Sequence, residues 1–333
     1  MLTRRRMLAS LAGCSLTAAG IVPAAASIAD PLGTIRRLSD EPLLAPRGTG
    51  FESAGIFNPS AAKTPDGIVL LYRAQDAAGT SRIGYAKSTD GYHFERRAEP
   101  VLSPTSAYEA EGGVEDPRLV EIDGTHYLTY TGYNSIAATA QLCLATSKNL
   151  IDWDRQGVIL PANAGTWNVH WTKSGAIVPQ KIRGRWYMYY LGEANENPPG
   201  QMGLAVSDDL LHWKDATPAP VLHTRARSFD SQVVEPGPAP ILLDEGILLI
   251  YNGANDYLVY STGWALFDRT DPSKLLARSR EPIFGAELPW ERVGQVPNVV
   301  FVEGMIRDAE RLTLYYGAAD KNIGVATTFL RAK

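Results

Sequence analysis

Ile83-Gly84-Tyr85-Ala86 is the first of five short segments that repeat along the chain at a nearly constant interval. The other four are Leu142-Cys143-Leu144-Ala145, Met202-Gly203-Leu204-Ala205, Thr262-Gly263-Trp264-Ala265 and Ile323-Gly324-Val325-Ala326. Their alanines are separated by 59, 60, 60 and 61 residues. A strand-like repeat of about sixty residues is typical of radial arrays such as β-propellers. We therefore expect an all-β fold in which five repeats surround one central channel.

Each repeat is predicted to contain four antiparallel strands, and the second repeat shows the pattern most clearly. An inner strand over Asp116–Ile122 is followed by the turn Asp123-Gly124 and a returning strand over His126–Thr131. Asp-Gly between two apolar runs is a strong hairpin signal, because glycine tolerates positive φ. The third strand is expected to end near Ala145 and the fourth to cover 157–160. No segment keeps an apolar period of 3.6 long enough to support helical repeats instead.

A proline followed by two apolar residues marks the expected fourth strand in several repeats. The marker occurs at Pro42-Leu43-Leu44, Pro100-Val101-Leu102, Pro220-Val221-Leu222 and Pro282-Ile283-Phe284. The last repeat has no such marker after Ala326, whereas the first marker precedes the first inner strand. We therefore predict that residues 42–44 supply the outer strand of the fifth blade. This pairing would close a five-bladed β-propeller and cover an otherwise open sheet edge.

Residues 1–26 have the features of an export signal. Arg4-Arg5-Arg6 begins a basic region that leads into an apolar, alanine-rich stretch ending at Ala26, which resembles a bacterial twin-arginine signal peptide. A membrane anchor is less favoured because the apolar stretch is short. A lipoprotein attached through Cys14 is the other alternative. We expect export to the periplasm or the cell exterior, with residues 27–333 forming a single catalytic domain.

The composition excludes several classes of partner. The formal net charge is −4, and removal of the three arginines of the leader changes it to −7. A net-acidic surface argues against nucleic acid or an anionic membrane as the partner. Without the leader, Cys143 is the one cysteine, so no internal disulfide can form. The five histidines show no metal-ligand spacing, and we expect no metal or other cofactor.

Polar side chains recur where inner strands begin and where returning strands end, two positions that share one end of a hairpin. The inner strands begin near Asn58, Asp116, Lys173, Glu235 and Asn298. The returning strands end near Arg73, Tyr133, Glu193, Asn255 or Asp256, and Asp320. Taken singly, such residues often only satisfy turn amides or form structural ion pairs. As a converging set with both signs of charge, they predict a carbohydrate pocket, because glycoside cleavage uses two carboxyl groups.

The segment Gly112-Gly113-Val114-Glu115-Asp116-Pro117-Arg118 carries the most specific signal. Strand alternation would send Glu115 and Asp116 to opposite faces, so that only one of them faces the channel. The alignment with Asn58 selects Asp116. We expect Glu115 to pair with Arg118 or with a backbone amide instead.

Several segments together resemble glycoside hydrolase family 130, from about Pro42 to the C-terminus. They are Asn58-Pro59, Leu71-Tyr72-Arg73-Ala74, Gly113-Val114-Glu115-Asp116-Pro117-Arg118, Tyr130-Thr131-Gly132-Tyr133, Gly237-Pro238-Ala239-Pro240-Ile241 and Tyr316-Gly317-Ala318-Ala319-Asp320. That family comprises five-bladed propellers that act on β-mannosides as phosphorylases or as hydrolases. The resemblance implies that Asp116 is the general acid. It also implies that the sugar is held by Asn58, Arg73, Lys173 and Asp320, to which the ring of strand starts adds Asn298.

Two departures from the family pattern favour hydrolysis. The phosphorylases of the family carry a His-Arg pair at the end of the second strand of the third blade, where this chain has Tyr189-Tyr190-Leu191-Gly192-Glu193. They also carry a histidine where this chain has Asn252. These replacements remove the electrostatic partners of phosphate. A carboxylate at Glu235, or at Glu193 as alternate or assistant, can instead take a proton from water.

We therefore predict an exported, inverting hydrolase of β-mannosides, with β-1,2-linked manno-oligosaccharides as candidate substrates. Asp116, with a pKa raised by its neighbours, would protonate the leaving oxygen directly or through a substrate hydroxyl, and Glu235 would activate water. Inversion predicts a separation of roughly 6.5–9.5 Å between the two carboxyl groups. The alternatives are a β-mannoside phosphorylase, a non-catalytic sugar-binding propeller, and a propeller glycosidase acting on arabinosides or fructosides.

Overall fold

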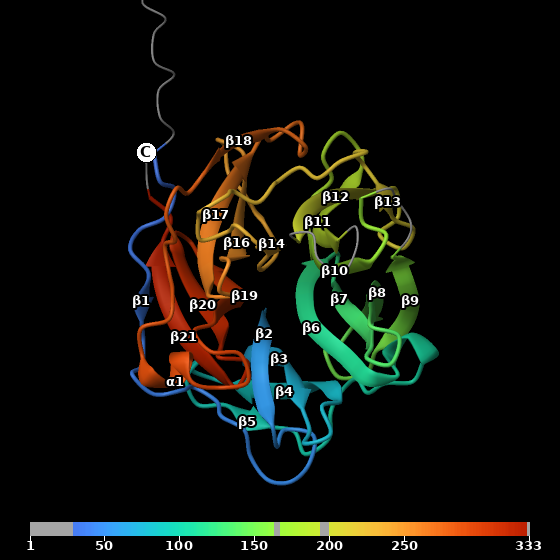
Figure 1. Ribbon diagram of the computed structural model, residues 1–333, viewed down its shortest axis with the longest axis vertical. Coiled ribbons are helices and arrows are strands. Elements are labelled where there is room, and N and C mark those ends of the chain that lie inside the picture. The colour runs from blue at the N-terminus through green and yellow to red at the C-terminus, as the bar shows by residue number, and fades with distance from the viewer. Residues whose placement is uncertain (1–28, 163–166, 194–199, 332–333) are drawn as a thin grey trace, which may run out of the picture.

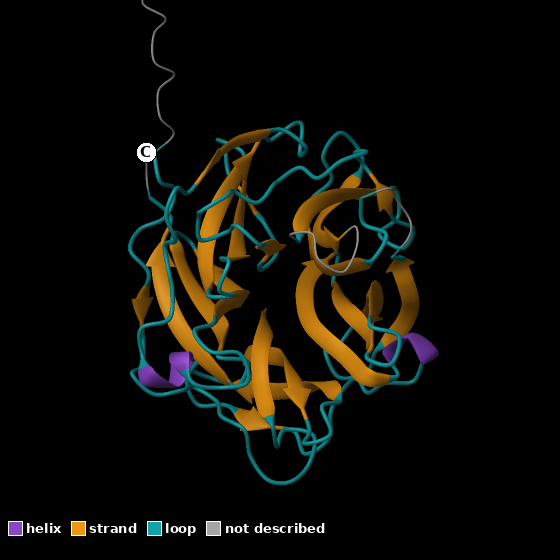
Figure 2. Cartoon of the chain, viewed as in Figure 1, coloured by secondary structure: helices purple, strands orange, loops and turns teal. Residues whose placement is uncertain are grey.

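The computed structural model describes residues 29–162, 167–193 and 200–331. The expected leader at 1–26, including Cys14, lies outside the described residues. Apart from the 3-10 helix η1 (Ala107–Glu109) and the short helix α1 (Pro289–Arg292), the regular elements of the described chain are β-strands (Figure 2). The all-β prediction is therefore confirmed. Among the helices of these residues, none has the length and apolar character to cross a membrane.

Antiparallel pairing divides the strands into five groups. The first group contains β2 (Gly55–Thr64), β3 (Gly67–Gln75), β4 (Ser81–Ser88) and β5 (Glu95–Arg96), and the second contains β6 (Glu111–Ile122), β7 (Thr125–Asn134), β8 (Thr139–Ser147) and β9 (Asp154–Leu160). The third contains β10 (Trp171–Ile177), β11 (Trp186–Glu193), β12 (Gln201–Ser207) and β13 (Lys214–Asp215). The fourth contains β14 (Val233–Pro236), β15 (Ile241–Leu242), β16 (Ile247–Ala254), β17 (Tyr260–Phe267) and β18 (Leu275–Arg278). The fifth contains β19 (Val300–Asp308), β20 (Arg311–Ala318), β21 (Asn322–Phe329) and β1 (Arg36–Arg37).

The groups are arranged around a common centre, with β2, β6, β10, β14 and β19 innermost (Figure 1). The backbones of neighbouring groups are joined by single bridges rather than by long ladders. The parallel bridges are Ser81 to Gly113, Ala140 to Trp171, Gly200 to Val233 and Tyr260 to Val299. The amide of Ile56 donates to the carbonyl of Lys321 and joins the fifth group to the first. Side chains that start the inner strands are therefore brought together from all parts of the sequence.

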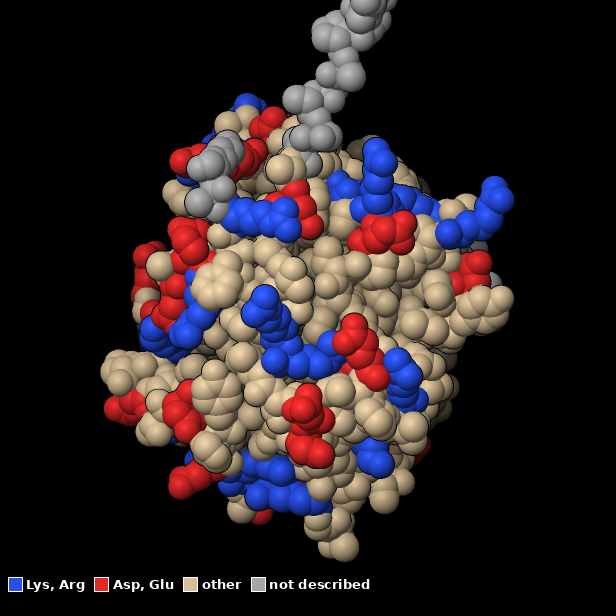
Figure 3. All heavy atoms as spheres, turned by 90° about the vertical axis from the view of Figure 1, so that its left-hand side faces the viewer, with Lys and Arg blue, Asp and Glu red and all other residues tan. Residues whose placement is uncertain are grey.

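The N-terminal segment pairs with the last strand, as predicted. β1 pairs with β21 through Arg36 opposite Thr327 and Arg37 opposite Ala326, and Leu44 forms a bridge with Ile323. The pairing therefore begins earlier than the Pro42 marker suggested. The other markers also reach the third strand of their groups, through the single bridges of Leu102, Leu222 and Phe284. Lysine, arginine, aspartate and glutamate side chains are mixed on the side of the molecule that carries β1, without a patch of one sign (Figure 3).

The repeated glycine of the third strands lies opposite a tyrosine of the second strand. The cross-strand pairs are Tyr72 with Gly84, Tyr130 with Cys143, Tyr190 with Gly203, Tyr251 with Gly263 and Tyr316 with Gly324. A Cβ atom added at Gly84 would lie 2.4 Å from Cε2 of Tyr72, and one at Gly324 would lie 2.3 Å from Cζ of Tyr316. The buried ring thus requires a very small neighbour, which explains the repeat seen in the sequence.

Each of these tyrosines donates its hydroxyl to a carboxylate, an arrangement that we call the tyrosine clamp. The pairs are Tyr72 with Glu52, Tyr130 with Glu109, Tyr190 with Asp215, Tyr251 with Asp230 and Tyr316 with Glu291. In four groups an arginine completes the clamp: Arg47 and Arg96 at Glu52, Arg155 at Glu109, Arg225 at Asp230, and Arg37 at Glu291. A buried carboxylate is tolerated there because it is paired and hydrogen-bonded.

Apolar side chains fill the space between neighbouring groups. Leu142 of the second group packs in one cluster with Met188 of the third. Trp213 belongs to the same cluster and is 8% exposed, and Trp153 packs against the core of the second group. Both tryptophans therefore contribute to packing within and between the groups.

Glu303-Gly304 resembles the Asp123-Gly124 turn in sequence, but it does not form a turn. Strand β19 continues through it to Asp308. The pair forms a β-bulge between Val302 and Gly304, and the turn lies at Ala309, which has φ 53°. Glu-Gly is compatible with either a turn or a bulge, since both need a residue that tolerates unusual backbone geometry.

Candidate active site

β-Bulges at the start of the inner strands direct the polar side chains. Asn58, Asp116 and Ser174 have φ of 48°, 51° and 62°, and each lies at a register shift in the pairing of its strand with the next. A bulge adds one residue to a strand and turns its side chain in a new direction. The residue equivalent to Asn58 and Asp116 in the third group is therefore Ser174, and not Lys173 as the sequence alignment suggested.

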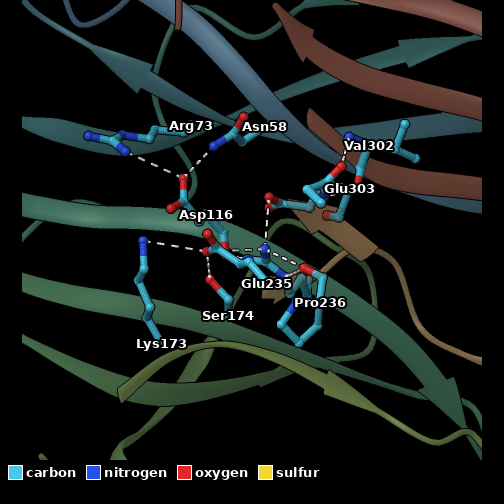
Figure 4. A network of polar contacts seen from close by, with 12 residues as sticks. Asn58, Arg73, Asp116, Lys173, Ser174, Glu235, Pro236, Val302 and Glu303 are labelled. Atoms are coloured by element: carbon cyan, nitrogen blue, oxygen red, sulfur yellow. Dashed lines mark hydrogen bonds and ion pairs between the residues drawn. The ribbon is translucent and has the colours of Figure 1, made fainter. Parts of the chain in front are cut away.

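Asp116 is nearly buried and receives two donors on one oxygen. Asn58 Nδ2 lies 2.8 Å from Asp116 Oδ1, and Arg73 Nη1 lies 3.4 Å from the same atom (Figure 4). Burial acts to raise the pKa of Asp116, but the charges of Arg73 and Lys173 outweigh it, and the pKa is lowered. The expected raised pKa is thus wrong for Asp116 in the free protein.

Glu115 shares Arg73 with Asp116, contrary to the prediction that the two acids diverge. Arg73 Nη2 lies 2.6 Å from Glu115 Oε1, and Ser81 Oγ lies 3.2 Å from the same oxygen. The bulge at Asp116 breaks strand alternation, so Glu115 pairs with Arg73 and not with Arg118. Burial, with a contribution from Asp116, raises the pKa of Glu115 to about 7. Of the two acids, Glu115 is therefore the one that takes up a proton first as the pH falls.

Glu235 lies on β14 and is 2% exposed. Lys173 Nζ lies 3.4 Å from Glu235 Oε1, Arg118 Nη2 lies 3.8 Å from it, and Ser174 donates a short hydrogen bond to it. Burial acts to lower the pKa of Lys173, but Glu235, Tyr260, Asp116 and Glu193 together outweigh it, and the pKa is raised. Because Asp116 also interacts with Lys173, both predicted catalytic carboxylates share this cation.

Glu193 ends β11, opposite Trp171 on β10, and remains partly exposed. Burial and the charge of Glu235 raise the pKa of Glu193, while Lys173 opposes them. Glu193 is thus close enough to Glu235 for their charges to interact, at the more open side of the cluster.

Asp320 follows β20 and belongs to the same electrostatic cluster. Burial raises its pKa to about 6, with Arg73 opposing and Asp116 contributing. Asn298, with φ 57°, precedes β19, and its carbonyl accepts a hydrogen bond from the amide of Tyr260. The described contacts of Asn298 are therefore those of its backbone, while Asp320 lies with the predicted site residues.

Three other predicted residues have mainly structural contacts. Asn255 accepts hydrogen bonds from the amides of Tyr257 and Val259, which shapes its loop. Asp256 accepts hydrogen bonds from Ser231 and Gln232. Tyr133 packs edge-on against Trp171, at a distance of 6.1 Å between ring centroids.

Three residues of the cluster were not predicted as site residues. Ser174 contacts Glu235 (Figure 4). Arg118 lies within ion-pair distance of both Glu235 and Glu303. Ser174 could have been found by allowing one extra residue at each bulge. The sequence did not indicate Glu303 as a site residue, because the pair Glu303-Gly304 resembles a turn.

The chain forms an all-β ring with carboxylates, amides and cations clustered on its inner strands. These are the features of a carbohydrate-active enzyme. The chain belongs to glycoside hydrolase family 130, whose family model, described as β-1,4-mannooligosaccharide phosphorylase, matches residues 46–332. This membership favours mannosides over the arabinoside and fructoside alternative.

Individual relatives carry names for two reactions. The chain is 40% identical over 301 residues to a 1,2-β-oligomannan phosphorylase of Thermoanaerobacter sp. (strain X514), covering 88% of this chain and 96% of the relative. A solved structure of β-1,2-mannobiose phosphorylase from Listeria innocua with β-1,2-mannobiose is 26% identical, with a TM-score of 0.79 and coverage of 89% and 97%. Another structure, from work on glycoside hydrolases of this family that target β-1,2-mannosidic linkages in Candida mannan, is 34% identical, with a TM-score of 0.79 and coverage of 90% and 94%.

Proposed function

We propose that this protein cleaves β-mannosidic bonds, with β-1,2-linked manno-oligosaccharides as substrates, and inverts the configuration at the anomeric carbon. The observation that carries the proposal is the pair of buried carboxylates, Asp116 and Glu235, on inner strands of different groups with Lys173 interacting with both. Two carboxyl groups on opposite sides of a glycosidic bond are what acid–base cleavage needs. We also infer that the five groups are the blades of a five-bladed β-propeller.

Asp116 is proposed as the general acid, although its pKa is lowered in the free protein. A bound sugar displaces water from Asp116, and such desolvation favours the protonated form of a carboxyl group. Asn58, Arg73 and Asp320 lie around the same carboxyl group and would bind the hydroxyls of the mannosyl unit. The proton would reach the leaving oxygen directly or through a substrate hydroxyl.

The names of the relatives favour phosphate as the acceptor. The oligomannan and mannobiose enzymes are both phosphorylases, so the comparisons support the phosphorylase alternative better than the hydrolase prediction. In phosphorolysis, an oxygen of phosphate bonds to the anomeric carbon while the glycosidic bond breaks, and mannose 1-phosphate is released.

The charges of the site favour water as the acceptor, and on this geometry we propose hydrolysis. Lys173, the cation nearest to Glu235, already interacts with Glu235, Asp116 and Glu193. A phosphate placed there would face these carboxylates, and like charges in a poorly solvated site repel strongly. In hydrolysis, the water oxygen bonds to the anomeric carbon, Glu235 takes the water proton, and Asp116 protonates the departing oxygen.

Product analysis on β-1,2-mannobiose, with and without inorganic phosphate, tests both reactions. The expected result is release of mannose at the same rate in both conditions, with the α-anomer formed first in NMR spectra. Formation of mannose 1-phosphate that requires phosphate would replace hydrolysis by phosphorolysis. Binding without any product would favour the sugar-binding alternative over both reactions.

We further propose that the protein is exported through the twin-arginine pathway. The support is the sequence of residues 1–26, which resembles such a signal. Fractionation of cells that express the full chain, with Arg4-Arg5 replaced by Lys-Lys in a control, tests this; an unchanged distribution in the control would contradict it.

A further inference from the structure

Arg118 is buried beneath both candidate catalytic carboxylates. Its side chain is 1% exposed. Nη1 donates to the carbonyl of Asp116 at 3.1 Å, and Nε and Nη2 donate to the carbonyl of Pro236 at 3.1 and 2.8 Å. Nη2 also lies 3.8 Å from Glu235 Oε1. One guanidinium group therefore connects the backbone of the proposed acid to the carboxylate of the proposed base and to the backbone of the residue that follows it.

Glu303 is the second anion at this guanidinium group. Its side chain is fully buried, and Oε2 lies 3.3 Å from Arg118 Nη2. Among the described residues, neither oxygen of Glu303 has a hydrogen-bond donor, so the ion pair with Arg118 is its close polar contact. Burial raises the pKa of Glu303, with Asp116 and Glu235 contributing.

The backbone of Glu303 is fixed by the fourth group. Asn252 donates its side-chain amide to the carbonyl of Val302 and accepts from the amide of Val302, both at 2.9 Å. Glu303 follows immediately and lies on the bulge of β19, which directs its side chain toward Arg118. The carboxylate is therefore held in place by β16 and β19, independently of Arg118.

A buried acid with a single ion-pair partner is expensive for stability. Replacing buried ion pairs by apolar residues often leaves stability unchanged or improves it. Such groups are retained most often where they orient other charges, as at functional sites.

We propose that Glu303 is a positioning residue: it holds Arg118 in the orientation that fixes the Asp116 carbonyl and the Glu235 carboxylate. The inference rests on the proposed function, because it assumes that these two residues are the acid and the base. Glu303 itself does not contact the substrate. Its removal should therefore slow the chemical step more than it weakens substrate binding.

Steady-state kinetics of Glu303→Ala and Glu303→Gln on β-1,2-mannobiose test the proposal. For Glu303→Ala we expect kcat to fall by at least about tenfold with KM within about threefold, because small displacements of catalytic groups slow reactions strongly. Glu303→Gln should recover most of kcat, since the amide keeps the shape of the carboxyl group and an oxygen beside Arg118. Glu109→Gln is the matched control: Glu109 is equally buried and pairs with Arg155 in a tyrosine clamp, so its loss should lower the melting temperature without changing kcat.

Two results would overturn the proposal. One is a kcat of Glu303→Ala equal to that of the wild type. The other, should that variant fail to fold, is wild-type kcat in Arg118→Lys, which lacks the fork that binds Pro236 and Asp116 together. A crystal structure of Glu303→Gln or Glu303→Ala separates this inference from the proposed function. Arg118 and Glu235 unmoved in Glu303→Ala would overturn the positioning role, whereas a wild-type protein inactive on all mannosides would refute only the function.

Discussion

At the scale of single residues, backbone conformation decides which acids meet. Asp116 adopts φ 51°, a conformation that few non-glycine residues adopt, and this places Glu115 and Asp116 around the same Arg73. The sequence predicted the importance of Asp116 from its position in the repeat. It could not predict the pairing of Glu115, because strict alternation of side chains fails at a bulge and the spacing of the chain does not reveal the bulge.

Asp116→Asn should abolish turnover while leaving the fold intact. The amide keeps the shape of the carboxylate but cannot deliver a proton, and loss of a general acid typically slows a reaction by about 10²–10⁴-fold. The initial rate on β-1,2-mannobiose and the melting temperature would be measured together. Asp256→Asn is the control, since Asp256 contacts Ser231 and Gln232 in a loop and should retain nearly full activity. Retained activity in Asp116→Asn would end the assignment of the acid.

Glu115→Gln should weaken the dependence of stability on pH. Burial raises the pKa of Glu115 to about 7, so the folded protein binds this proton more tightly than the unfolded chain does. Its stabilising contribution is complete below the unfolded pKa of about 4.3 and is lost as the pH rises through about 7. The free energy of unfolding of the wild type should therefore fall between pH 5 and pH 8.

Urea unfolding at pH 5 and pH 8 measures this effect. In Glu115→Gln the fall should be smaller by an amount on the order of 1 kcal/mol. It should not vanish, because Asp320 and Glu193 also have raised pKa values and act in the same direction. An equal fall in both proteins would show that Glu115 does not carry the proton.

At the scale of elements, the repeat in the sequence results from the packing of the strands and not from the residues of the candidate active site. The repeated position of each third strand needs a small residue because a buried tyrosine ring lies against it. Glycine occupies this position in four groups, and Cys143 occupies it opposite Tyr130. Hairpin turns with local chemistry, such as Asp123-Gly124, were predictable. The alignment of Lys173 with Asn58 was wrong by one residue, since a bulge shifts the register without changing the composition of the strand.

Gly324→Ala should destabilise the protein by about 1–3 kcal/mol, the usual cost of overpacking a well-packed core. The added methyl group would lie 2.3 Å from the ring of Tyr316, which is fully buried and bonded to Glu291, so the ring has no free space to enter. Thermal unfolding followed by circular dichroism measures the change. Gly50→Ala is the control, because a Cβ atom at Gly50 has nothing within 4 Å. Similar melting temperatures for the two variants would contradict the clamp as a packing constraint.

At the scale of the whole molecule, the arrangement of the five groups brings residues that are distant in sequence close together in space. Asn58, Asp116 and Glu235 come from three groups, and the ring predicted from the repeat was sufficient to expect them together. The partners within the cluster were not predictable, because they depend on side-chain directions across groups. Arg118 illustrates this: it lies in the same motif as Asp116, yet it contacts Pro236 and Glu303 from two other groups.

Arg37 on β1 contacts α1 and the residues that precede this helix. Arg37 Nε lies 2.7 Å from Glu291 Oε1, Nη2 donates to the carbonyl of Gly285, and the guanidinium group lies 4.5 Å from the ring centroid of Phe284. Its neighbour Arg36 is exposed and pairs with β21 through its backbone. The two arginines therefore form a matched pair, in which the Arg37 side chain holds β1 against α1 and the Arg36 side chain faces solvent.

Arg37→Ala should destabilise the protein by about 3 kcal/mol, because it leaves the carboxylate of Glu291 buried without its cation. It should also raise the tendency to aggregate, since a loosened first strand exposes the edge of β21 for pairing with other chains. Arg36→Ala should change stability by no more than about 0.5 kcal/mol, as is usual for an exposed side chain. Urea unfolding and light scattering on heating measure both properties. Equal behaviour of the two variants would mean that the backbone pairing of β1, and not the Arg37 side chain, keeps the first strand on β21.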